Sequence, residues 1–172
     1  MKKLYAPSTI ADIKSRHDFR LSKSLGQNFI TDKNVIEKIV EGAEIGEEDL
    51  VIEIGPGIGV LTAAAAETAC KVIAVEIDKK LIPILSETLS DHDNIEIINR
   101  DILKTDVNGI IEKSRQAGEF SGKVRIIGNL PYYITTAIIM KLLEEKTEAE
   151  SITIMMQKEG ADRVKASPGG KT

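Results

Sequence analysis

The sequence is poor in the residues that build disulfides and metal sites. It has one cysteine, Cys70, and two histidines, His17 and His92, which are far apart in the chain. One cysteine cannot form a disulfide framework, and this set does not supply the ligands of a typical metal centre. We therefore expect neither a disulfide nor a bound metal.

Long apolar runs are also missing. No stretch approaches the roughly 18 residues of a membrane-spanning helix, and the start, MKKLYAPSTIADIK, lacks the apolar segment of a signal peptide. An apolar fraction of 42% and a charged fraction of 29% are ordinary for a globular protein, and 172 residues is the size of one domain. These features predict a cytoplasmic protein that is not attached to a membrane.

Negative charge predominates overall but not at the start of the chain. The net charge of −4 argues against a general nucleic-acid binder. Residues 1–38 contain eight Lys or Arg and four acidic residues, so this segment carries +4 and the remainder −8. A basic N-terminal arm is compatible with docking on a phosphate backbone, and a solvated terminus explains the same charges equally well.

Short apolar runs alternate with segments of helical length. The runs expected to be strands are Leu50–Ile54, Lys71–Glu76, Ile95–Asn99, Lys123–Ile127 and Ile152–Met156. The segments expected to be helices are 32–43, 59–69, 79–90, 104–117 and 135–146. This alternation predicts an α/β fold, a mostly parallel sheet with helices on both faces.

A glycine loop follows the first predicted strand directly. Gly55, Gly57 and Gly59 stand in GPGIG, before the predicted helix VLTAAAAETA. Glycines at a strand-to-helix turn permit positive φ and close approach of a ligand, and the helix N-terminus favours negative charge. Glu76 ends the second strand 21 residues after Gly55, where an acid can accept hydrogen bonds from ribose hydroxyls. Together these features predict a nucleoside-containing cofactor at the carboxyl edge of the sheet.

The spacing of the glycines favours one class of cofactor. The dinucleotide fingerprint is G-x-G-x-x-G, whereas this loop is G-x-G-x-G, which argues against a nicotinamide-dependent oxidoreductase. The shorter form is common in S-adenosylmethionine-dependent methyltransferases. After the third strand, Asp101 can accept a hydrogen from an adenine amino group while Ile102 packs on the ring. A simple N-cap is the alternative role for Asp101.

The fourth predicted strand leads into Asn129-Leu130-Pro131-Tyr132. If the methyl acceptor is an adenine N6 amine, the Asn129 side-chain oxygen and the Leu130 carbonyl can accept its two hydrogens. The nitrogen lone pair then faces the methyl donor. Pro131 would fix a turn without a competing N–H, and Tyr132 offers a ring on which an extruded base stacks, worth about 1–3 kcal/mol. A proline turn with aromatic residues over the sheet edge explains the tyrosines but gives Asn129 no role.

These motifs together resemble the ribosomal RNA small-subunit adenine N6-dimethyltransferases, the kasugamycin-sensitivity methyltransferases. The resemblance covers nearly the whole chain and implies the Rossmann-like S-adenosylmethionine-dependent methyltransferase fold. The segments that carry it are SLGQNF at 24–29, GPGIGVLT at 55–62, the strand ending in Glu76, Arg100-Asp101, NLPYYITT at 129–136 and MQKE at 156–159.

The resemblance implies a role for each matching residue. The implied cofactor-binding residues are Gln27, Asn28, Ile30, Gly55, Gly57, Gly59, Glu76, Ile77, Asp101, Ile102 and Asn129. The implied catalytic residues are Asn129, Leu130, Pro131 and Tyr132, with Phe29 and Tyr132 contacting the substrate. We expect residues 1–31 to form a basic arm that closes over the cofactor, and residues 32–172 to form the methyltransferase domain.

The resemblance also implies a reaction and its partners. Family members transfer methyl groups from S-adenosylmethionine to two adjacent adenosines in a hairpin near the 3′ end of 16S rRNA. They act on the assembling 30S subunit, in ribosome biogenesis, and we expect a monomer without metal. They carry two more strands and a helical RNA-binding domain, so the expected fold lacks these last strands and that domain. The alternatives are a macrolide-resistance type 23S rRNA adenine methyltransferase, or a cofactor- and rRNA-binding module without turnover.

Overall fold

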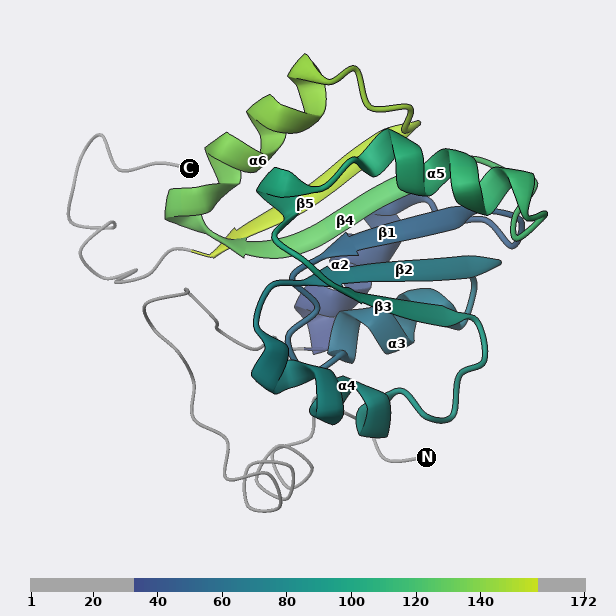
Figure 1. Cartoon of the computed structure of the whole chain (residues 1–172). Helices are drawn as coiled ribbons and strands as arrows, with labels where there is room; N and C mark the ends of the chain where they lie inside the picture. The colour runs from purple at the N-terminus through teal and green to yellow at the C-terminus, as the bar shows by residue number, and fades with distance from the viewer. Residues whose placement is uncertain (1–32, 158–172) are drawn as a thin grey trace.

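The computed structural model describes residues 33–157 of the chain. Its five strands form one parallel sheet in the order β3-β2-β1-β4-β5 (Figure 1). The chain runs outward from β1 to β3 and then crosses to the other side of β1 to form β4. Strands β1 and β4 therefore flank the point where the strand order reverses, which is where such sheets bind ligands. The strands are β1 (Leu50–Ile54), β2 (Lys71–Glu76), β3 (Ile95–Asn99), β4 (Val124–Pro131) and β5 (Ser151–Gln157).

Helices cover both faces of this sheet. In Figure 1, α2, α3 and α4 lie on one side and α5 and α6 on the other. Because both faces are covered, every residue of the central strand β1 is buried. The predicted α/β architecture is confirmed. The helices are α2 (Lys33–Ala43), α3 (Val60–Ala66), α4 (Ile82–Thr88), α5 (Val107–Gln116) and α6 (Tyr132–Glu144).

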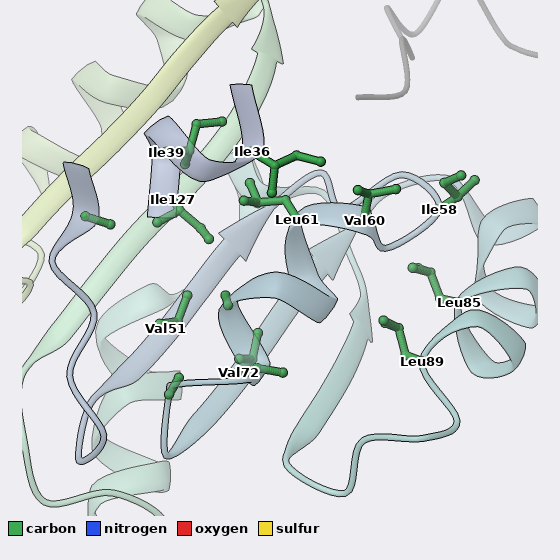
Figure 2. Packing of buried hydrophobic residues seen from close by; sticks show 14 of the residues in the cluster. Ile36, Ile39, Val51, Ile58, Val60, Leu61, Val72, Leu85, Leu89 and Ile127 are labelled. Atoms are coloured by element: carbon green, nitrogen blue, oxygen red, sulfur yellow. The ribbon is translucent and has the colours of Figure 1, made fainter. Parts of the chain in front are cut away.

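Two apolar clusters follow from the alternation of side chains along β1. Leu50, Ile52 and Ile54 pack on the side of α5 and α6, whereas Val51 packs on the side of α2, α3 and α4. Since successive strand residues point to opposite faces, Glu53 shares the side of Val51. That strand therefore carries an ionisable group into an apolar layer. Figure 2 shows this layer, with Ile36, Ile39, Val51, Ile58, Val60, Leu61, Val72, Leu85, Leu89 and Ile127 labelled.

The largest difference from the predicted boundaries lies in β4. Strands β1, β2 and β3 have the predicted bounds, but β4 runs to Pro131 instead of ending at Ile127. Pairing with β5 continues through Asn129 and Leu130 to Pro131, which has extended dihedral angles (φ −59°, ψ 145°). Helix α6 then begins at once. The interpretation of a proline turn here is wrong, because the neighbouring strand keeps this segment extended.

Two helices begin later in the chain than predicted. Asp106 accepts a hydrogen bond from the Gly109 N–H at 3.0 Å, so α5 begins at Val107. Asp78 accepts one from the Lys80 N–H at 2.9 Å, and a short 3-10 turn precedes α4. Short polar side chains compete with the helix for its first backbone donors, which sets these starting points.

None of the helices in residues 33–157 combines the length and apolar composition needed to cross a bilayer. In the same part of the chain, no three His, Cys, Asp or Glu side chains are grouped so that they could hold a metal ion. Cys70 is exposed and is a free thiol.

Candidate active site

The glycine loop takes a backbone conformation that its glycines permit. The φ angles are 68° at Gly55, 62° at Gly57 and 95° at Gly59, a region that residues with a side chain rarely adopt. The Gly55 N–H donates to the Val75 carbonyl of β2 at 3.0 Å, and the Gly59 N–H donates to the Pro56 carbonyl at 3.0 Å. The loop is therefore a closed turn fastened to β2, directly before α3.

Replacing Gly59 by alanine is expected to lower the free energy of unfolding by about 1–3 kcal/mol. Besides the strained φ, an added Cβ would lie 3.0 Å from Leu89 Cδ2 and 3.1 Å from Thr88 Oγ1 at the end of α4. Gly118→Ala is the matched control, because Gly118 also has positive φ but a Cβ there would meet nothing within 4 Å. Urea unfolding should show the larger loss for Gly59→Ala. Equal losses of unfolding free energy in the two variants would mean that Thr88 and Leu89 move aside at little cost.

Glu76, the last residue of β2, is buried and bound to the loop. The residue is 2% exposed. Its Oε1 accepts a hydrogen bond from the Gly57 N–H at 3.2 Å, and its Oε2 accepts one from the Asp78 N–H at 2.9 Å. Burial raises the pKa of Glu76 above its usual range, the hydrogen bonds from Asp78 and Gly57 lower it, and the Asp78 carboxylate raises it. Each carboxylate oxygen keeps a second acceptor position, so the ribose contact stays a prediction compatible with this geometry.

Asp101 follows β3 and caps the next turn. Its Oδ1 accepts a hydrogen bond from the Leu103 N–H at 3.0 Å. The capping role is therefore present, and the contact with adenine stays a prediction. Ile102 packs in the core with α5 and α6, whereas Ile77 is 51% exposed. Ile77 is thus the better placed of the two for an apolar contact with a ligand.

Asn129 and Leu130 lie next to the glycine loop. Strand β4 pairs with β1 up to Gly128 opposite Ile54, so Asn129 is level with Gly55. A Cβ on Gly55 would lie 3.4 Å from Leu130 Cδ2, which shows how closely the loop and β4 approach. The Asn129 side chain is half-buried and has no hydrogen-bond partner among the residues that the structure describes. The fold thus brings the predicted amine-binding residue to the predicted cofactor loop.

Tyr132 begins α6 at the same edge of the sheet. It is 53% exposed, and Tyr133 is 54% exposed. The Pro131 carbonyl accepts a hydrogen bond from the Thr135 hydroxyl at 2.8 Å, which supports the first turn of α6. The Tyr132 ring is therefore accessible, as base stacking requires, and the stacking itself stays a prediction.

Some predicted site residues lie outside the described part of the chain. Gln27, Asn28, Phe29 and Ile30 belong to the expected arm, 1–31, which precedes the first described residue. Their implied contacts rest on the sequence alone.

Two buried residues at the base of the loop, Glu53 and Thr62, were not predicted from the sequence. The Thr62 hydroxyl of α3 donates a hydrogen bond to Oε1 of Glu53 in β1, and both residues are almost fully buried. A signal for Glu53 was available, since it is the one charged residue in the apolar run LVIEI. Its partner could not be found from the sequence, because the contact depends on how α3 packs on the sheet.

The fold and the glycine loop define the class of protein. A parallel sheet whose first strand enters G-x-G-x-G and whose second ends in an acid is the Rossmann-like arrangement of S-adenosylmethionine-dependent methyltransferases. The same fold is seen in an RNA methyltransferase from Salinibacter ruber, solved in complex with S-adenosyl-L-homocysteine. That structure is 18% identical with a TM-score of 0.54, over 76% of this chain and 79% of that chain.

The chain belongs to the ribosomal RNA adenine dimethylase family, whose model matches residues 18–172. The ribosomal RNA small subunit methyltransferase A of Alkaliphilus metalliredigens is 54% identical over 172 residues, and that of Clostridioides difficile is 48% identical over 171. Both matches cover 99% of this chain, which spans 58% of the length of each relative.

Two further solved structures are similar as well. A dimethyladenosine transferase from Plasmodium falciparum is 29% identical with a TM-score of 0.60, over 81% of this chain and 47% of that chain. The 23S rRNA methyltransferase ErmE is 33% identical with a TM-score of 0.58, over 83% of this chain and 52% of that chain. The two TM-scores are almost equal.

Proposed function

We propose that this chain is the cofactor-binding and catalytic part of an enzyme that methylates N6 of adenosines in small-subunit rRNA. The observation that carries the proposal is the position of Asn129, level with Gly55 where the strand order reverses. The names of the relatives support small-subunit rRNA as the substrate. In the finer form of the proposal, the target is two adjacent adenosines in a hairpin near the 3′ end of 16S rRNA. The assembling 30S subunit presents them, so the reaction belongs to ribosome biogenesis.

The residues at the sheet edge fit S-adenosylmethionine, which supplies an electrophilic methyl group on a sulfonium. Glycine backbone at positive φ lets the ligand approach the loop, and the Glu76 carboxyl has acceptor positions left for ribose hydroxyls. Asp101 and the exposed Ile77 would hold the adenine. We also propose the division into an arm, 1–31, that closes over the cofactor, and a methyltransferase domain, 32–172.

The acceptor amine would be held from the other side, by β4. In this role the Asn129 side-chain oxygen and the Leu130 carbonyl accept the two N6 hydrogens, and Tyr132 stacks on the base. An aromatic amine is a weak nucleophile, so the contribution of these residues is to orient its lone pair and to exclude water. The proton that the amine loses after methylation passes to water, and no side chain of the site has to act as a base.

The test is transfer of tritiated methyl groups from S-adenosylmethionine to ribosomal subunits purified from cells that lack this methylation. We expect label in the 16S rRNA of small subunits, on dimethyladenosine after digestion, and none in fully methylated small subunits. Large subunits from the same cells are the control substrate. Label confined to 23S rRNA would contradict the proposed substrate, and binding of S-adenosylhomocysteine without any transfer would leave only a binding module.

A second candidate is methylation of 23S rRNA, which the similarity to ErmE favours. Sequence relatives at 48–54% identity are named for the small subunit, and this is the stronger indication. The subunit assay separates the two directly.

A further inference from the structure

Glu53 is a buried residue with a carboxyl group, and it has no role in the proposed reaction. It lies in the middle of the sheet, in β1, and is 1% exposed. It precedes the glycine loop by two residues, on the side of the sheet that α2, α3 and α4 cover. Burying a carboxyl group away from water destabilises the fold unless the group is hydrogen-bonded or neutral.

The contact of Glu53 connects the two ends of the glycine loop. Oε1 of Glu53 accepts a hydrogen bond from the hydroxyl of Thr62, which is itself fully buried. Glu53 stands before the loop in β1, and Thr62 stands after it in the first turn of α3. The contact therefore joins β1 to α3 across the loop.

The surroundings of Glu53 favour the neutral acid. Burial raises the pKa of Glu53 to about 8, with the Thr62 hydrogen bond lowering it and the Glu76 carboxylate raising it. No cation among the described residues forms an ion pair with it. The charged residues of the helices that cover this face are exposed: Lys33, Glu37, Lys38 and Glu41 of α2, Glu67 at the end of α3, and Glu87 of α4.

We propose that Glu53 is a positioning residue for the cofactor. As a neutral carboxylic acid it joins β1 to α3 through Thr62 and holds the glycine loop in its binding conformation, and its ionisation at alkaline pH weakens binding of S-adenosylmethionine. This inference rests on the proposed function. The reason is that an ionised Glu53 faces the carboxyl of Glu76 in an apolar layer without a counter-ion, and it gains solvation only when α3 moves away. Since Glu76 also holds Gly57, the strain reaches the loop from both sides.

The test is the dissociation constant of S-adenosylhomocysteine, measured by calorimetry between pH 6.5 and 9.5. For the unaltered chain we expect the constant to rise by about tenfold from pH 7 to pH 9, because the ionised form binds poorly. Glu53→Gln keeps a neutral hydrogen-bonding group, so this rise should disappear. The amino group of the ligand titrates in both experiments, and the difference between the two proteins isolates Glu53. Glu67→Gln, an exposed carboxyl at the end of α3, is the matched control and should follow the unaltered chain.

A second measurement needs no ligand. An acid whose pKa is raised by folding binds a proton that the unfolded chain releases, so stability falls as pH rises from about 4.3 to about 8 and is level above that. The Tm of Glu53→Gln should therefore exceed that of the unaltered chain by an amount that grows across this window. Thr62→Val should weaken S-adenosylhomocysteine binding at pH 7, and Thr62→Ser, which keeps the hydroxyl, should restore it.

The outcomes separate this inference from the proposed function. Binding of S-adenosylhomocysteine with the same pH dependence in the unaltered chain and in Glu53→Gln would overturn the inference alone. Absence of binding at every pH would overturn the proposed function and the inference with it. A Tm difference that does not change with pH would contradict the neutral state of Glu53.

Discussion

Replacing Asn129 by alanine is expected to lower the rate of methyl transfer by about 10²–10³-fold, the usual effect of removing one aligned polar group from a reacting centre. The dissociation constant for S-adenosylhomocysteine should rise only modestly, because the glycine loop and Glu76 stay in place. The measurement is single-turnover transfer of tritiated methyl groups to undermethylated small subunits, with calorimetry on the same protein. The loss should appear in kcat far more than in cofactor affinity.

The structure explains why such a loss would be large. Asn129 belongs to β4 and pairs with Met155 of β5, so its backbone is held by the sheet and not by a loop. Its side-chain oxygen has no partner among residues 33–157 and is available to an incoming amine. An acceptor that is fixed before the substrate arrives needs no reorganisation during the reaction.

Asn129→Asp is the matched variant for this prediction. It keeps an acceptor oxygen at nearly the same position, so its loss of transfer should be clearly smaller than that of Asn129→Ala. Normal turnover in Asn129→Ala would show that the amine is oriented by other groups. A loss of rate fully explained by weaker cofactor binding would assign Asn129 to the cofactor alone.

Removal of the Asp49 side chain should destabilise the fold by about 3–5 kcal/mol, as expected when one partner of a buried ion pair is removed. Asp49 directly precedes β1 and is 5% exposed. Its Oδ1 accepts a hydrogen bond from the Lys123 N–H at 2.8 Å. Its Oδ2 accepts hydrogen bonds from the Gly46 N–H at 2.8 Å and from Arg125 Nε at 3.3 Å. In Asp49→Ala these three donors lose their acceptor, and only the backbone pairing still joins the start of β1 to β4.

The pH dependence of this contribution follows from the pKa of Asp49. Burial raises this pKa, but the N–H groups of Gly46 and Lys123 and the guanidinium of Arg125 lower it by more, so it lies below its usual range. A carboxyl with a lowered pKa contributes stability above its unfolded value of about 3.9 and loses it as pH falls through the folded value. The difference between the unaltered chain and Asp49→Ala should therefore be constant near neutral pH and shrink in acid.

Denaturant unfolding at several pH values measures both the loss of stability in Asp49→Ala and its dependence on pH. Glu48→Ala is the matched control, because Glu48 is the exposed acidic neighbour of Asp49, and it should change the free energy of unfolding by less than about 0.5 kcal/mol. Similar losses of unfolding free energy in the two variants would mean that the ion pair between Asp49 and Arg125 contributes little to stability. A difference that grows in acid would show that Asp49 is not ionised in the folded protein.

Much of the fold was accessible from the sequence because its strands are short and apolar. The runs that became β1, β2 and β3 stand between helix-length segments, and their bounds are confirmed residue by residue. The end of β4 was not accessible in the same way. Proline usually marks a turn, and only pairing with β5 keeps the chain extended through Pro131.

Parts of the candidate site were also predictable from the sequence, and other parts were not. GPGIG and Glu76 were found from their spacing, since the loop and the acid belong to one βαβ unit. The burial of Glu76 and its hydrogen bond with Gly57 could not be predicted, because both depend on how the loop folds over the end of β2. Ile102 was expected at the ligand, but its side chain belongs to the core between the sheet and α5.

The order of apolar runs, glycines and acids along the chain was enough to determine the parallel α/β architecture and the edge of the sheet where chemistry takes place. That information is local, because each motif lies within one strand and the turn after it. The protonation state of the buried carboxyl groups was decided only by the tertiary structure. Glu53 meets Thr62 and Glu76, and Asp49 meets Arg125, through the packing of distant segments. The cost of a charge depends on the water and the partners around it, which no short stretch of sequence contains.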